Sequence, residues 1–185
     1  LERQELAGEA LRYDIILEHG VHSWLQAIPV AIIKRDGVVQ DARYQWLPKT
    51  PIVGRAQYSV ESYPASRLDR SIDRVMRFRN LQLPAGFNPQ TRELAEQWRE
   101  LEPAERVNAA QKFFKERPFV YTLEPPKLGR NSVDEFLFSS RRGYCEHYAS
   151  SLVYMMRAAG VPARVVLGYQ GGERNSAGNY LLVHQ

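Results

Sequence analysis

The chain has 185 residues, of which 44% are apolar and 25% charged, so it can bury the core of one medium domain or two small ones. Its formal net charge of +4 comes from arginines interleaved with acidic residues, as in RLDRSIDRVMRFR, and this pattern does not indicate nucleic-acid binding. The single cysteine, Cys145, excludes an intrachain disulfide and a zinc site built from several cysteines.

The sequence shows neither the pattern of a secretory signal nor that of a membrane span. The first residues, LERQELAGEA, lack the charged start and apolar stretch of a secretory signal. No run approaches the roughly 18 apolar residues of a membrane span. These observations leave open that the sequence is a piece of a larger membrane protein.

The first part of the chain, residues 1–66, is predicted to form a small β domain. Apolar and polar residues alternate in LRYDIIL (11–17) and in RAQYSVESY (55–63), which is the period of two of a half-buried strand. Between AIIKR and VVQ lies Asp36-Gly37, a dipeptide that predicts a tight hairpin turn.

Residues 67–87 are predicted to form a connecting helix and a linker. Leu68, Ile72 and Val75 are spaced as on one helical stripe, and the proline-containing segment LQLPAGFNP follows. We expect this helix to pack between two domains rather than to lie on a membrane surface.

Residues 88–185 are predicted to form a second domain of helices followed by strands. Three helices are predicted by their start signals, a cap followed by proline or a capping box: Asn88-Pro89, Glu102-Pro103, and Ser132 with Glu135. The best helical pattern follows Gly143 and stops at Gly160. ARVVLGY (163–169) and GNYLLVHQ (178–185) are predicted as strands. Helices segregated from strands indicate an α+β fold.

Cys145 lies at the first turn of the strongest predicted helix. Unpaired backbone N–H groups and the helix dipole at that position favour an anion such as a thiolate. The spacing to Ala149 and Leu152 predicts that the thiol shares the buried face of the helix. Position alone does not decide between a reactive thiol and a small buried hydrophobic residue.

A nucleophilic cysteine needs a base, which is usually a histidine. His147 is only two residues away, so it points to nearly the opposite side of the helix and is expected to pack locally. His19 and His22 belong to the β domain and are expected at the surface. His184 lies on the last predicted strand, but no acidic residue follows it in the sequence.

The string RRGYCEHYASSLVYMMRAAGVPARVVLGYQGGE resembles the core motif of the transglutaminase-like superfamily. That motif is a glycine-aromatic-cysteine at a helix start, followed by a turn of the type RAAGVPAR into a strand. LPAGFNPQTRELA, RPFVYTLEPPKLG and NSVDEFLF resemble a bacterial, membrane-anchored branch with an extracytoplasmic transglutaminase-like domain. The resemblance covers about residues 80–185.

This resemblance implies a papain-like core of helices packed on an antiparallel sheet, preceded by the small β domain. It also implies a catalytic triad in the order cysteine, histidine, aspartate, of which only Cys145 carries over. In relatives the histidine stands in a word like DAHAW, which His184-Gln185 does not match. We therefore interpret His184 as an incidental strand residue. We expect the other triad members beyond Gln185, so that this chain, with its core truncated at the C-terminal end, is inactive alone.

The resemblance implies a protein-glutamine gamma-glutamyltransferase of the bacterial inner membrane, with this domain in the periplasm. Its partners would be a glutamine-bearing protein or peptide and an amine donor of the cell envelope. The interleaved charges predict no nucleic-acid partner, the four histidines and one cysteine do not form a metal-ligand spacing, and we expect no cofactor. Three alternatives remain open: a cysteine peptidase or amidase, an enzyme like arylamine N-acetyltransferase, and a non-catalytic binding module.

Overall fold

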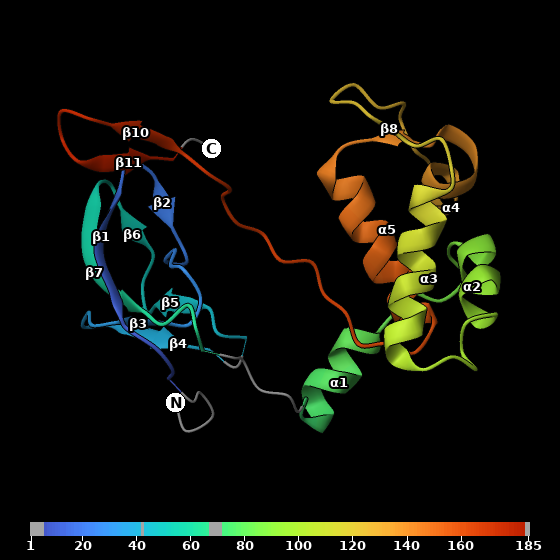
Figure 1. Cartoon of the computed structure of the whole chain (residues 1–185), viewed down its shortest axis with the longest axis horizontal. Coiled ribbons are helices and arrows are strands. Elements are labelled where there is room, and N and C mark those ends of the chain that lie inside the picture. The colour runs from blue at the N-terminus through green and yellow to red at the C-terminus, as the bar shows by residue number, and fades with distance from the viewer. Residues whose placement is uncertain (1–5, 42, 67–71, 184–185) are drawn as a thin grey trace. The chain divides into compact units, whose positions relative to one another are not determined.

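The computed structural model describes residues 6–41, 43–66 and 72–183. Its contacts divide the chain into two units, Leu1–Ser71 and Ile72–Gln185. The first unit, blue to teal in Figure 1, contains strands, and the second contains the helices together with short strands. The helices are mixed with mainly antiparallel strand pairs, which agrees with the α+β expectation.

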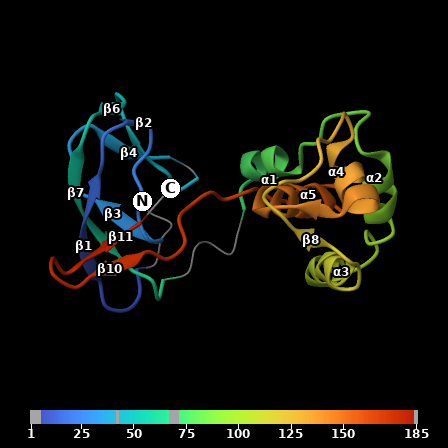
Figure 2. The ribbon, with the colours of Figure 1, turned by 90° about the horizontal axis from the view of Figure 1, so that it is seen from above.

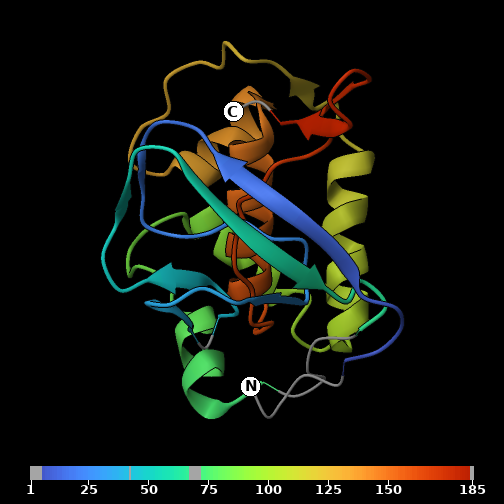
Figure 3. The same ribbon diagram turned by 90° about the vertical axis from the view of Figure 1, so that its left-hand side faces the viewer.

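The first unit is built on a three-stranded antiparallel sheet in the order β1-β7-β3. Strand β1 (Leu11–Leu17) pairs with β7 (Ala56–Ser62) along its full length, and Figure 3 shows the two running side by side. Every second side chain of β7 is buried, as the alternating sequence predicts. The core of the unit comprises Leu25, Ala31, Ile33, Trp46, Tyr58 and Val60.

The prediction of a hairpin at Asp36-Gly37 is wrong. Strand β3 (Ala31–Ile33) pairs with β7, whereas β4 (Val38–Gln40) pairs with β5 (Trp46–Pro48). Gly37 has the positive φ of +73° that the dipeptide suggested, so the turn exists but joins strands of two different sheets. A separate pair, β2 (Val21–His22) with β6 (Ile52–Val53), completes the described strands of this unit.

The second unit is a helical cluster arranged around α5 (Cys145–Ala158). Figure 2 shows α2 (Pro89–Glu96) and α3 (Pro103–Lys115) beside α5. The short α1 (Arg74–Leu81) contacts α5 as well. The residues of the core that are fully or nearly fully buried are Ala95, Trp98, Ala110, Phe113, Val133, Phe136, Leu137, Tyr154, Met155, Met156, Ala158 and Ala159.

The remaining elements of the second unit surround the start of α5 or follow its end. Before α5 the chain forms β8 (Val120–Tyr121), α4 (Ser132–Asp134), the π-helix η1 (Glu135–Ser140) and β9 (Arg142–Gly143). After α5 it forms the antiparallel hairpin of β10 (Glu173–Asn175) and β11 (Tyr180–Leu182). Within the described parts of the chain, no helix is long and apolar enough to span a bilayer.

Two local predictions in this unit are wrong. ARVVLGY (163–169) has no regular secondary structure, and its Leu167 side chain is 86% exposed, because no described strand pairs with it. The capping box of Ser132 with Glu135 is also not formed. Asn131 precedes α4 instead, and the Glu135 carboxylate accepts a hydrogen bond from the Gly129 N–H at 2.6 Å.

Candidate active site

The start of α5 is held by a short parallel pairing of β8 with β9. The N–H of Val120 donates to the Arg141 carbonyl at 2.8 Å, and the N–H of Thr122 donates to the Gly143 carbonyl at 2.9 Å. Tyr144 is extended, with φ −115° and ψ −173°, and Cys145 is the first residue of the helix. The strand pairing therefore fixes the direction in which the chain enters α5.

Cys145 is exposed, whereas the sequence predicted an inward thiol. The prediction is wrong because α5 buries its C-terminal part: its buried residues begin at Ser151 and include Met155 and Met156. Within the described residues, the thiol is free and takes part in no hydrogen bond. An exposed thiol at a helix start is accessible to a reagent or a substrate.

His147 packs locally, as the sequence predicted. Its Nδ1 lies 3.5 Å from the backbone nitrogen of Tyr144 and accepts that N–H in a weak helix cap. Its ring meets the Tyr144 ring edge to face, with centroids 4.6 Å apart, and lies 5.5 Å from the Phe136 ring. The ring is thus held against the residues that precede the helix, on the side of α5 away from the Cys145 position.

The tyrosine before the cysteine is coupled to the glutamate after it. The Tyr144 hydroxyl donates to a carboxylate oxygen of Glu146 at 3.4 Å. The negative charge of Glu146 raises the pKa of Tyr144 above its usual value, with partial burial as the second cause. Burial also raises the pKa of Tyr148. Both phenols are therefore neutral at pH 7 and present hydroxyl groups rather than charges near Cys145.

A depression of about 380 Å³ opens beside the first turns of α5. It is lined by the loop at Pro125 and Pro126, by Phe136, and by the α5 side chains of His147 and Ser151. These α5 positions lie on the side of the helix opposite Cys145. Tyr144 and Glu146, the residues on either side of Cys145, also line the depression, so it adjoins the start of the helix.

Of the remaining histidines, the structure describes His19 and His22, and both belong to the first unit. The ring of His22 forms a hydrogen bond with the Glu18 carbonyl at 2.9 Å in the first unit, and His19 lies in the same exposed turn. His184, interpreted from the sequence as an incidental strand residue, lies outside the described residues. In residues 6–41, 43–66 and 72–183 there is also no cluster of three or more His, Cys, Asp or Glu side chains that could hold a metal ion.

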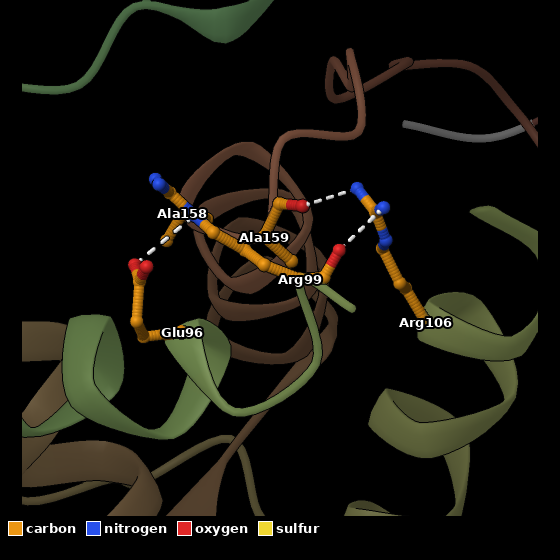
Figure 4. A network of polar contacts seen from close by, with 5 residues as sticks. All are labelled: Glu96, Arg99, Arg106, Ala158 and Ala159. Atoms are coloured by element: carbon orange, nitrogen blue, oxygen red, sulfur yellow. Dashed lines mark hydrogen bonds and ion pairs between the residues drawn. The ribbon is translucent and has the colours of Figure 1, made fainter. Parts of the chain in front are cut away.

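Arginine side chains anchor the other end of α5 (Figure 4). Arg106 donates to the carbonyls of Ala159 and Arg99, each at 2.7 Å, and Arg99 donates to the Ala158 carbonyl at 3.1 and 3.2 Å. Cations at a helix C-terminus satisfy carbonyls that lack intrahelical partners and oppose the negative end of the dipole. The helix that carries Cys145 is thus fixed at both ends.

A pair of buried polar residues, missed by the sequence reasoning, joins α2 to α4. The Asp134 carboxylate accepts from the backbone N–H groups of Gln90 at 3.0 Å and Thr91 at 2.8 Å, and from the Thr91 hydroxyl at 2.5 Å. In return, the Asn88 side-chain oxygen accepts from the N–H groups of Val133 and Asp134, at 3.1 and 3.2 Å. Each helix start is capped by the other segment, which no short-range sequence signal indicates.

Comparisons with known proteins agree with this geometry. Residues 92–184 match the transglutaminase-like superfamily. The chain is 45% identical over 180 residues to a Pseudomonas aeruginosa protein named protein-glutamine gamma-glutamyltransferase. The chain belongs to the transglutaminase-like superfamily. The resemblance inferred from RRGYCEHYAS and RAAGVPARVV is confirmed.

The structural relatives confirm the transglutaminase-like fold class. The periplasmic domain of TgpA from Pseudomonas aeruginosa superposes with a TM-score of 0.93 at 43% identity, over 98% of this chain and 64% of that one. The same domain bound to ethylmercury gives a TM-score of 0.92 at 44% identity, over 98% of this chain and 66% of that one. An uncharacterized Bacillus subtilis protein, YebA, is 40% identical over 78 residues, which cover 40% of this chain and 11% of YebA.

The chain spans a minor part of its curated relatives. The alignment to the Pseudomonas enzyme covers 96% of this chain but 27% of that protein. Similarity to this enzyme supports a transglutaminase-like function for the superfamily domain.

Proposed function

We propose that Cys145 is the nucleophile of a protein-glutamine gamma-glutamyltransferase that uses a Cys-His-Asp triad. The observation that carries the proposal is the 45% identity to the Pseudomonas enzyme across 96% of the chain. The structure adds a single cysteine that is exposed at the first residue of a helix. This is the position at which backbone N–H groups stabilise an anionic sulfur and an oxyanion.

The proposed reaction is a double displacement at a carboxamide. The Cys145 thiolate attacks the glutamine side-chain carbonyl, and the amide nitrogen takes a proton from the protonated base of the triad. The C–N bond then breaks, ammonia leaves and a thioester remains. A primary amine then attacks the thioester carbonyl and gives up a proton to the base. The C–S bond breaks, which releases the amide product and the Cys145 thiolate. Water in place of the amine would give glutamate.

We propose that the base and its aspartate partner come from outside the described residues. His147 supports this assignment because its Nδ1 and its ring face are already engaged by Tyr144 and Phe136. We therefore expect the 185-residue chain alone to form no product, although its Cys145 remains open to alkylation.

We further propose that this chain lies in the periplasm as part of a protein of the bacterial inner membrane. The support is its likeness to the periplasmic domain of TgpA over 98% of the chain. The proposed substrates are glutamine-bearing proteins or peptides and an amine donor of the cell envelope, which share that compartment.

The test is incorporation of a labelled primary amine into a glutamine-bearing protein by the full-length protein. We expect incorporation by the native protein and none by Cys145→Ala. His22→Ala, which keeps Cys145 and removes a hydrogen bond to the Glu18 carbonyl in the first unit, should incorporate the amine as the native protein does. Equal labelling by the native protein and Cys145→Ala would reject the proposal. Release of ammonia without labelling would identify an amidase, and turnover of acetyl-CoA would identify an N-acetyltransferase.

A further inference from the structure

The imidazole of His147 is in tight contact with the backbone that leads into α5. A Cβ atom placed on Gly143 would lie 2.7 Å from Cγ and 2.8 Å from Cβ of His147. Real Cβ atoms do not approach other atoms so closely, so only glycine fits beside this ring. Gly143 is buried, and its own carbonyl is the acceptor that ties β9 to β8.

The same ring also contacts the next residue of the chain. It accepts the Tyr144 N–H and meets the Tyr144 ring edge to face. His147 therefore touches both residues that precede Cys145, although it lies about 200° around the helix from the thiol. A ring in this position cannot exchange a proton with the sulfur, but it can set where the sulfur lies.

We propose that His147 is a positioning residue for the Cys145 nucleophile. The ring, whose Nδ1 faces the Tyr144 N–H, holds Gly143 and Tyr144 in the conformation that makes Cys145 the first residue of α5. The N···N distance of 3.5 Å is long for a hydrogen bond. The shape of the ring beside Gly143 is therefore the larger constraint.

This constraint matters because the thiol has no other restraint within the described part of the chain. Cys145 is exposed and makes no hydrogen bond there. Its place is set by the backbone of the preceding two residues. Misplacement of a reacting atom by about 1 Å can lower a catalysed rate by about a hundredfold.

The inference rests on the proposed function, because it takes Cys145 as the nucleophile, and its test uses two independent readouts. The first is the rate of Cys145 alkylation by iodoacetamide, which requires no acyl transfer. The second is kcat/KM for amine incorporation by the full-length protein, measured over pH. The variants are His147→Ala, His147→Gln and His147→Phe, with His22→Ala as the matched histidine control. Circular dichroism establishes that each variant is folded.

We expect His147→Ala to slow alkylation about three- to tenfold, because a frayed first turn stabilises the thiolate less. Its kcat/KM should fall roughly ten- to a hundredfold. His147→Phe, which keeps the ring, should stay within about threefold of the native protein in both readouts and keep the shape of the pH profile. His147→Gln, which keeps an acceptor but no ring, should behave like His147→Ala and replaces it if that variant is unfolded.

Three results would overturn the inference. One is a native alkylation rate in both folded His147→Ala and His147→Gln. Another is a His147→Phe protein as slow as His147→Gln. The third is native alkylation in His147→Phe combined with loss of amine incorporation and of one limb of the pH profile, which would identify His147 as a proton-transfer group. If the native protein incorporates no amine, the proposed function fails and the alkylation rates still decide the positioning role.

Discussion

The Asp134 carboxylate offers the clearest single test of what holds the second unit together. Asp134 is 3% exposed and Thr91 is 0% exposed, so the two hydrogen bonds between them are shielded from water, and the one from the Gln90 N–H is partly buried. In Asp134→Ala the two backbone N–H groups and the Thr91 hydroxyl lose their acceptor. Water cannot replace it without opening the core.

The magnitude follows from the ordinary cost of such losses. Loss of a helix N-cap costs about 0.5–2 kcal/mol, and each buried donor left without a partner costs about 1–3 kcal/mol. These contributions overlap at one site, so we expect the free energy of unfolding to fall by about 3–5 kcal/mol. Asp134→Asn retains one acceptor oxygen and should lose about half as much, roughly 1.5–2.5 kcal/mol.

The assay is urea unfolding followed by circular dichroism at 222 nm, which reports the second unit because the described helices lie there. The matched control is Asp73→Ala. Asp73 also caps a helix, accepting the Met76 N–H at 2.8 Å, but it is exposed. Its loss should cost about 1 kcal/mol or less. A loss in Asp134→Ala no larger than that of Asp73→Ala would refute the argument from burial.

Three further outcomes are expected from the described contacts. Burial raises the pKa of Tyr58 to about 12, so the first unit should lose about 2–3 kcal/mol of stability as pH rises from about 10 to 12. Tyr58 ionises at lower pH in the unfolded state than in the folded state, so Tyr58→Phe should remove this loss in thermal melts followed by tryptophan fluorescence. An unchanged pH dependence in Tyr58→Phe would contradict the prediction. Gly143→Ala should lower the free energy of unfolding in urea by about 1–3 kcal/mol and slow Cys145 alkylation, because the added Cβ would overlap the His147 ring. Native values of both would be inconsistent with the close contact. Arg106→Lys should lower the free energy of unfolding in urea by about 1–2 kcal/mol, because a lysine cannot reach three carbonyls at once. A loss equal to that of Lys112→Ala, which removes an exposed ion pair, would argue against a stabilising role of Arg106 at the end of α5.

Local patterns predicted the elements whose signals lie within a few residues. The alternation in LRYDIIL and RAQYSVESY gave β1 and β7, which pair along seven residues. Glu102-Pro103 opened α3, where the Glu102 and Glu105 side chains form a capping box. The helix from Cys145 ends just before Gly160, which has a φ of +82°. In each case the pattern that predicts the element lies among neighbours in the sequence.

The errors concern interactions between distant residues. Asp36-Gly37 specified a turn, but the partners of β3 and β4 were decided by β7 and β5. Val165 and Val166 carry β-branched side chains, yet no described strand pairs with them, so propensity alone produced no strand. Cys145 was expected inward because its helical stripe is apolar, whereas α5 packs through its later turns.

The place of the proposed nucleophile, Cys145, was predictable from the sequence, whereas the residues that hold it in place were not. The position of Cys145 at the start of α5 followed from the helix pattern, and the family followed from the longer strings around it. The contact of His147 with Gly143 became evident only from the close approach of ring and backbone. A glycine before a helix start, followed four residues later by a histidine, occurs in many unrelated structures and does not by itself predict this contact.

The exchanged caps of Asn88 and Asp134 have a consequence for how the second unit folds. Each helix start needs a side chain that lies 43 to 46 residues away along the chain. Neither α2 nor α4 can therefore acquire its cap before the intervening segment, including α3, has brought the two together. The backbone amides of Thr91 and Asp134 should consequently exchange with solvent hydrogen at one common rate, as members of a single cooperative unit. We therefore expect α2 and α4 to open and close together.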